Sequence, residues 1–236
     1  MHKKPSFLSV LFRFIILSGL KIIFQVFYRI RVNQLNPCTD WKNIKLIVLL
    51  NHTSLFELVF IAVAPFSYLW ELSKHLMLPA ADITYKRKIF GVFLRSLGVS
   101  VQSLTRKRDD SWFSFLSDIR EDSILVFAPE GRMKRKTGLD KEGKPMTVRG
   151  GIVEVLPYFK EHEMIFIYSG GLHHILAPGD KLVKIFKKVH LSLEKIKVLE
   201  YIKNFKNDTG LNKEKIIKDL EERRDRFCPK KPGENP

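Results

Sequence analysis

Three short, continuously apolar runs constrain the fold of this chain most, because helix-length sequence separates each run from the next. The runs lie within residues 45–50, 123–127 and 164–168. Apolar runs of this length are typical of strands that are buried on both faces of a sheet. Strands that alternate with helices indicate an α/β domain, with a mostly parallel sheet flanked by helices.

The segments between these runs carry the signals of further strands and helices. We expect a strand at 99–104, edge strands at 189–193 and 196–199, and helices at 55–64, 85–97, 111–119, 151–156 and from Asn212, as N-cap, to Phe227. In a mostly parallel sheet, ligands bind beyond the carboxyl ends of the strands. The residues that follow positions 50, 104, 127 and 168 are therefore the first candidates for a functional site.

The N-terminal segment, residues 7–30, is mostly apolar, but charges interrupt it. It therefore lacks the unbroken apolar core and the cleavage site of a secretory signal. Its polar side chains form a stripe on a helix: Ser9, Arg13, Lys21, Gln25 and Arg29. This pattern predicts a helix in the membrane interface, with its apolar side in the lipid and its cations toward lipid phosphates. Two alternatives stay open, an amphipathic helix packed on the domain's own core and a single tilted span with snorkelling charges.

The charge of the chain is strongly positive and unevenly distributed. Lys and Arg outnumber Asp and Glu by 41 to 25, and the excess is concentrated in residues 1–33, 86–108 and 131–150. These blocks indicate an anionic partner, which could be nucleic acid, an anionic membrane or a phosphorylated small molecule. The two cysteines, Cys38 and Cys228, fit neither a disulfide framework nor a metal motif, which favours a reducing, cytoplasmic setting.

The sequence Asn51-His52-Thr53-Ser54-Leu55-Phe56-Glu57 follows the first apolar run. One interpretation is structural: Ser54 and Glu57 form a capping box, and His52 is a polar residue at a strand end. The other is functional: Glu57 accepts the Nδ1–H of His52 and leaves Nε2 free to take a proton from a hydroxyl. No G-x-S-x-G motif accompanies the histidine, so that hydroxyl would belong to a substrate.

Two cation clusters follow the next strands along the chain. Arg106 comes after the strand at 99–104, and Pro129-Glu130-Gly131-Arg132 follows the run at 123–127. Arginine suits bidentate phosphate binding, and the alternative is a solvated basic loop. We expect Glu130 to orient one of these arginines.

These three blocks, in this order, resemble the motifs of the glycerolipid acyltransferases, the family of the lysophosphatidic acid acyltransferases. The family patterns read N-H-x-S-x-x-D, G-x-x-F-x-x-R and F-P-E-G-T-R-S. The matching residues here are His52-x4-Glu57, Gly98 to Arg106 and Pro129 to Arg132, within residues 45–168. The first block has Glu57 in place of Asp, the second is longer and more polar, and the third lacks Thr, so that Arg132 stands one place early.

The resemblance implies transfer of a fatty acyl group from acyl-CoA or acyl-carrier protein to the free hydroxyl of lysophosphatidic acid or a related lysophospholipid, in phospholipid synthesis or remodelling. It implies no covalent acyl-enzyme, metal or cofactor. Within it, His52 is the base and Glu57 its orienting partner, whereas the remaining residues bind or support the acceptor: Asn51, Ser54, Arg106, Glu130, Gly131 and Arg132. Residues 1–33 would be a membrane-associating segment and 34–236 an acyltransferase domain on the cytoplasmic face.

Two rival functions stay open alongside this expectation. A basic peripheral membrane protein without catalysis would use His52 and Glu57 only as a turn and a cap. A nucleic-acid-binding protein would explain the charge but not the apolar N-terminal segment, and no binding motif with interleaved aromatic residues is present. We therefore expect membrane lipids and an acyl thioester as partners, and no nucleic acid.

Overall fold

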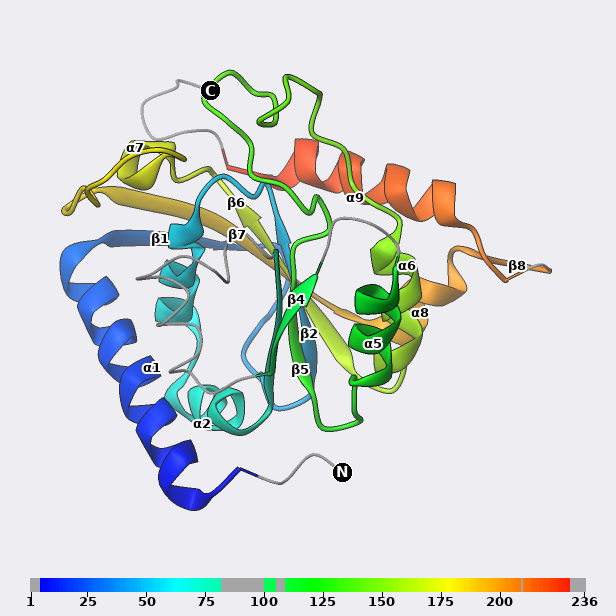
Figure 1. Ribbon diagram of the computed structural model, residues 1–236, viewed down its shortest axis with the longest axis horizontal. Helices are drawn as coiled ribbons and strands as arrows, with labels where there is room; N and C mark the ends of the chain where they lie inside the picture. Colours follow the sequence, from blue (N-terminus) through cyan, green and yellow to red (C-terminus); the bar gives the residue numbers. More distant parts are fainter. Residues whose placement is uncertain (1–4, 82–99, 105–108, 209, 230–236) are drawn as a thin grey trace.

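A seven-stranded sheet forms the centre of the computed structural model, which describes residues 5–81, 100–104, 109–208 and 210–229 (Figure 1). The strand order is β1-β7-β6-β2-β5-β3-β4, and only β6 and β7 pair antiparallel among these neighbours. The strands are β1 (Arg29–Gln34), β2 (Ile44–Leu50), β3 (Leu76–Ala81), β4 (Ser100–Leu104), β5 (Ile124–Phe127), β6 (Glu163–Ser169) and β7 (Lys188–Lys197). A separate two-stranded sheet joins β8 (Lys206–Asn207) to β9 (Gly210–Leu211).

Helices cover both faces of the large sheet. One layer contains α1 (Phe7–Phe27), the 3₁₀ helix η1 (Leu55–Val63), α2 (Phe66–His75) and α7 (His173–Leu176). The other contains α5 (Asp110–Ser117), α6 (Gly151–Val155), the 3₁₀ helix η2 (Leu156–Phe159), α8 (Val198–Lys203) and α9 (Lys213–Phe227). Side chains of β2 alternate between the layers: Ile47 packs in the first, and Leu46 and Val48 in the second.

The α/β fold predicted from the sequence is confirmed. The three apolar runs are β2, β5 and β6, the strand expected at 99–104 is β4, and Asn212 caps α9 by accepting the Lys215 N–H at 3.0 Å. The helix expected at 85–97 lies outside the described residues.

The helix expected at 55–64 is present as the 3₁₀ helix η1. Two local expectations were wrong. The two expected edge strands are one strand, β7, which hydrogen-bonds to neighbours on both sides. Arg29 begins strand β1 and does not continue the N-terminal helix. β7 is interior because β1, from the other end of the chain, pairs with it, and local periodicity carries no information on such a distant partner.

The orientation expected for the polar stripe of α1 is also corrected. α1 packs along η1 and α2, with Val10, Leu17 and Phe24 buried (Figure 1). Lys21 Nζ donates to Ala62 O at 2.6 Å, and Arg13 donates to the carbonyl of Ser73. Those carbonyls lie in the last turns of η1 and α2, where intrahelical donors are missing, so the two cations face the domain and cap its helices. The opposite, apolar side of α1 is exposed, and the helix is long and apolar enough to cross a membrane by length and composition.

Candidate active site

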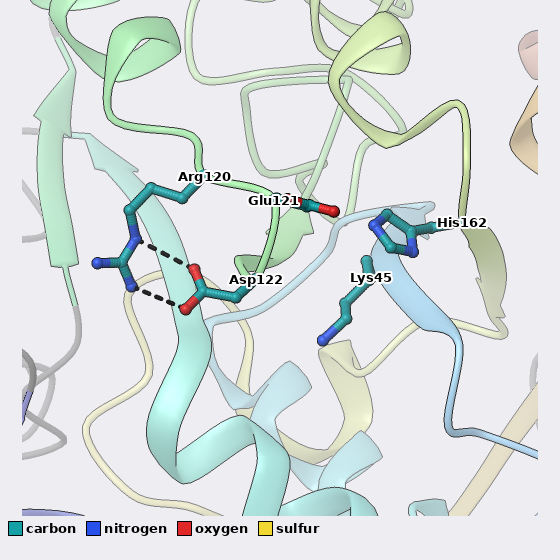
Figure 2. A pocket seen from close by; sticks show the side chains of 5 residues that line it. All are labelled: Lys45, Arg120, Glu121, Asp122 and His162. Carbon is teal, nitrogen blue, oxygen red and sulfur yellow. Dashed lines mark hydrogen bonds and ion pairs between the residues drawn. The ribbon is translucent and has the colours of Figure 1, made fainter.

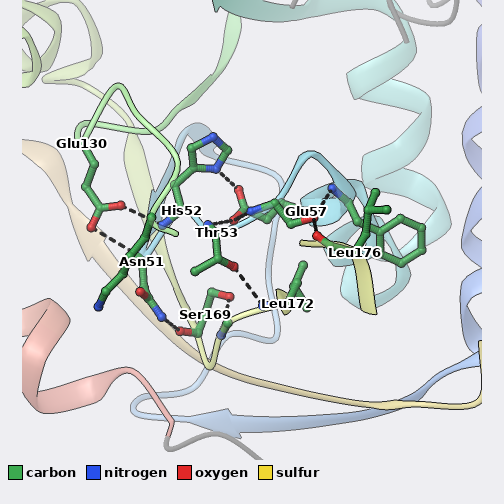
Figure 3. A network of polar contacts seen from close by, with 12 residues as sticks. Asn51, His52, Thr53, Glu57, Glu130, Ser169, Leu172 and Leu176 are labelled. Atoms are coloured by element: carbon green, nitrogen blue, oxygen red, sulfur yellow. Dashed lines mark hydrogen bonds and ion pairs between the residues drawn. The ribbon is translucent and has the colours of Figure 1, made fainter. Parts of the chain in front are cut away.

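The candidate site is built on the turn between β2 and η1, at the carboxyl ends of β2, β5 and β6 (Figure 3). Asn51 directly follows β2 and has a φ of 63°, in the left-handed region that non-glycine residues rarely adopt. This conformation reverses the chain immediately before His52. A turn at the carboxyl edge of a parallel sheet is where α/β proteins bind their ligands.

The structure brings His52 and Glu57 together. Nδ1 of His52 hydrogen-bonds to Oε2 of Glu57, while Oε1 of Glu57 accepts the backbone N–H groups of Thr53 at 2.8 Å and Ser54 at 3.4 Å. Ser54 Oγ in turn accepts the N–H of Phe56, so the capping box is formed as well. The structural and functional interpretations are therefore compatible, because the carboxylate that caps η1 is the one that holds the imidazole.

The second ring nitrogen of His52 is not engaged by the described residues. Nε2 makes no hydrogen bond to the part of the chain that the structure describes, and the side chain is 20% exposed. Burial lowers the pKa of His52, but the charge and hydrogen bond of Glu57 and the charge of Glu130 outweigh it, and the net pKa is raised. The neutral imidazole with its proton on Nδ1 would present Nε2 as a proton acceptor.

Glu130, in the turn three residues after β5, holds the backbone around His52. Its carboxylate accepts the N–H of His52 at 2.7 Å and that of Asn51 at 3.3 Å, and the residue is 1% exposed. Burial raises the pKa of Glu130, opposed by the His52 N–H and by the charge of Arg224. Arg224 of α9 is its arginine partner, at 3.4 Å. The expectation that Glu130 orients an arginine of its own loop is thus wrong for Arg132, because Arg224 approaches it from the C-terminal helix.

The turn that follows β6 locks the site from the other side. Asn51 Nδ2 donates to Ser169 O at 2.7 Å, and the Leu172 N–H donates to Thr53 Oγ1 at 2.8 Å (Figure 3). Ser54 Oγ donates to Leu176 O at 2.6 Å. These three bonds join two segments that are far apart in sequence, residues 51–54 and 169–176, which fixes the backbone around His52.

The loop after Glu130 contacts the site but engages its arginine elsewhere. The Lys134 N–H donates to His52 O at 2.8 Å, so the loop passes over the turn. Arg132 forms an ion pair with the buried Asp140, and its Nε is buried without a hydrogen-bond partner in the described ranges. Gly131 has a φ of 62°, a conformation that favours glycine. Arg106 lies outside the described residues.

The architecture is similar to that of a solved acyltransferase. The crystal structure of the 1-acyl-sn-glycerophosphate (LPA) acyltransferase PlsC from Thermotoga maritima matches with a TM-score of 0.57, covering 91% of this chain and 79% of that chain. This chain has the same fold. The two sequences are 16% identical, a level at which the similarity extends to the fold alone. No protein-family model and no curated protein sequence matches this chain.

A depression at the opposite edge of the sheet has different properties. It is lined by Lys45, Arg120, Glu121, Asp122 and His162, near the amino ends of β2, β5 and β6 (Figure 2). Arg120 pairs with Asp122, and none of the candidate site residues from the sequence analysis lines this depression. No cluster of His, Cys, Asp and Glu side chains suited to a metal ion occurs in the described ranges.

Sequence reasoning missed the tertiary supports of the site. Arg224 is 94 residues from Glu130, Ser169 is 118 residues from Asn51, and Asp140 lies in a loop interpreted only as basic. No local pattern marks Arg224, because one arginine on a charged, amphipathic helix looks like its solvated neighbours.

Proposed function

We propose that this protein is a membrane-associated O-acyltransferase. It moves a fatty acyl group from the thioester of acyl-CoA or acyl-carrier protein to the free hydroxyl of lysophosphatidic acid or a related lysophospholipid. The observation that carries the proposal is the His52–Glu57 pair at the carboxyl edge of the sheet. Nε2 of the imidazole has no partner among the described residues, and Glu130 holds the backbone of His52. The acyltransferase fold and the three sequence blocks support the same reaction class.

In this mechanism His52 acts as a general base and then as a general acid. Nε2 takes the proton of the acceptor hydroxyl while the oxygen attacks the thioester carbonyl. Glu57 holds the imidazole through Nδ1 and stabilises the imidazolium that forms. When the tetrahedral intermediate collapses, an ester bond forms, the C–S bond breaks, and the proton on Nε2 passes to the departing thiolate. The step balances without a metal or a redox cofactor.

We assign the acceptor phosphate to the loop after β5. Arg132 lies between Glu130 and Lys134, both of which bond the backbone of His52, so it belongs to the same local assembly. Asp140 engages one nitrogen of the guanidinium, and the buried Nε lacks a partner in the described ranges. An unsatisfied buried donor costs about 1–3 kcal/mol, which a phosphate oxygen would recover. We propose that Arg106 shares this role, with Gly131 allowing close approach.

Membrane association fits the position of the N-terminal helix. α1 packs on the domain through one side and exposes its apolar side, so it would lie in the interface of the cytoplasmic leaflet. A spanning orientation would require the helix to leave η1 and α2. Donor and acceptor chains would then reach the site from the bilayer.

The experiment that tests the proposal is a panel of lysolipid acceptors with a radiolabelled acyl donor. Wild type and His52→Ala would be compared after purification, with folding and membrane binding measured on the same samples. We expect His52→Ala to reduce transfer by about 10²–10⁴, the usual contribution of general acid–base catalysis, and to stay folded and membrane-bound. Near-wild-type transfer by that variant would refute the mechanism, and wild type inactive with every acceptor would favour a basic membrane protein without catalysis.

A further inference from the structure

Large apolar side chains that face solvent are concentrated in two segments of the described chain. One is the outer side of α1, with Phe7, Leu8, Phe12, Ile15, Ile22, Ile23 and Val26. The other is the connection between α7 and β7, with Leu182, Val183, Ile185 and Phe186. Soluble proteins rarely leave large contiguous apolar patches exposed, so we expect a binding partner or a membrane to cover these side chains.

The second segment, residues 181–188, is termed here the 181–188 loop. All eight of its residues are exposed, with Leu182 at 81% and Phe186 at 68%. Lysines stand at both ends and in the middle: Lys181, Lys184, Lys187 and Lys188. The loop contains no acidic residue. Exposed apolar side chains interleaved with cations complement the face of an anionic bilayer, where apolar acyl chains lie beneath negatively charged headgroups.

The loop is attached to the C-terminal end of α1. The Phe186 N–H donates to Phe27 O at 2.9 Å, their ring centroids lie 5.6 Å apart, and Arg29 N donates to Lys187 O at 3.1 Å. Phe186 has a φ of 58°, a strained conformation for a residue with a side chain. These contacts place the loop beside the C-terminal end of α1, where exposed Val26 lies one residue before Phe27 (Figure 1).

The same loop begins next to the candidate active site. It follows α7, whose Leu176 O accepts the hydroxyl of Ser54 and whose His173 bonds the Lys134 carbonyl. Lys184 N also donates to Ile175 O, which ties the loop to α7. A bilayer in contact with the loop would therefore lie at the side of the domain where His52 is held.

We propose that the 181–188 loop and the outer side of α1 form one docking surface for an anionic lipid bilayer. Leu182, Ile185 and Phe186 enter the boundary of the acyl chains, and the four lysines contact lipid phosphates. This inference rests on the membrane association within the proposed function but not on acyl transfer.

The test is co-flotation of the full chain with vesicles of phosphatidylcholine alone or of phosphatidylcholine mixed with phosphatidylglycerol. Lys181→Glu/Lys184→Glu reverses two charges in the loop, and Lys203→Glu/Lys206→Glu makes the same change in α8 and β8, on the opposite side of the molecule (Figure 1). We expect the loop variant to bind mixed vesicles at least about tenfold more weakly and the control variant to bind like wild type. Leu182→Ser should weaken binding to both vesicles by about tenfold, and Leu199→Ser, in α8, should not.

Two results would overturn the proposal. One is equal binding by the loop variant and wild type, or equal loss in the loop and control variants. The other is self-association of wild type without lipid that Leu182→Ser abolishes, which would make a second copy of the chain the occupant. Acyl transfer to a soluble short-chain acceptor should stay near wild type in the loop variants, so failure of docking and failure of catalysis are read separately.

Discussion

Replacing Glu57 by Gln should prevent His52 from acting as a base without unfolding the protein. The reason is that an amide has one acceptor oxygen where a carboxylate has two. Oε1 of Glu57 faces two buried backbone donors, the N–H groups of Thr53 and Ser54, and Oε2 faces Nδ1 of His52. A glutamine must direct its oxygen to one side and its NH₂ group to the other. The two choices have very different costs.

Directing the NH₂ group at the backbone would leave two buried N–H donors unsatisfied, at about 1–3 kcal/mol each. The oxygen will therefore face Thr53 and Ser54, and the NH₂ group will donate to Nδ1 of His52. The neutral imidazole then carries its proton on Nε2 and cannot accept one from a hydroxyl. We expect kcat to fall by about 10²–10⁴, with little change in the KM of the acceptor. Helix capping is retained, so the free energy of unfolding should fall by only about 1 kcal/mol.

Two measurements follow this change. Thiol release from the acyl donor gives kcat and KM, and NMR of the protein labelled with ¹⁵N-histidine identifies which ring nitrogen carries the proton. Glu154→Gln is the matched control, because it makes the same change in α6, whose residues pack on the opposite face of the sheet from η1. A Glu57→Gln protein with activity within about tenfold of wild type and the proton still on Nδ1 would show that the tautomer argument is wrong.

Three further predictions concern pH, the C-terminal helix and the strained turn. The raised pKa of His52 means that the neutral base dominates only at a pH above that pKa. We therefore expect kcat/KM to fall as the pH decreases, with a midpoint above about 6.5. A pH–rate profile with its midpoint below about 6.5 would contradict the assignment of His52 as the base. Arg224→Met removes the cation beside buried Glu130, so it should lower the free energy of unfolding by about 1–3 kcal/mol and lower kcat. The control Arg226→Met changes an exposed arginine and should leave both quantities unchanged. Equal unfolding curves for the two variants would show that Arg224 does not stabilise Glu130. Asn51→Ala should destabilise the protein by about 1 kcal/mol more than Asn51→Gly in chemical denaturation. Both variants lose the hydrogen bond to Ser169, but only glycine adopts a φ of 63° without strain. The opposite order of stability would argue against a strained turn at residue 51.

The interior strands and the His52–Glu57 pair could be predicted from the sequence, because both are local features. β2, β5 and β6 each contain a run of at least four consecutive apolar residues, a pattern typical of strands that are buried on both faces. His52 and Glu57 are five residues apart across a strand-to-helix turn, a spacing at which the two side chains can meet. The capping box of Ser54 and Glu57 is equally local.

The edges of the sheet and the supports of the site were decided by contacts between distant segments. β7 became interior because β1, from the other end of the chain, pairs with it, and the cations of α1 turned inward because the last carbonyls of η1 and α2 lacked donors. Nothing near Glu130 in sequence indicates that it would bond the backbone of His52, 78 residues away, or pair with Arg224.

Periodicity and capping motifs record which face of an element is buried and where it begins, so the sequence alone determined the layered α/β fold and the imidazole–carboxylate pair. Which strand neighbours which, and which distant side chain fills a vacant hydrogen bond, depends on the joint packing of all the elements. Only the tertiary structure therefore decided that Glu130 and Arg224 hold the turn, that Arg132 pairs with Asp140, and that a lysine-rich loop lies beside the C-terminal end of α1.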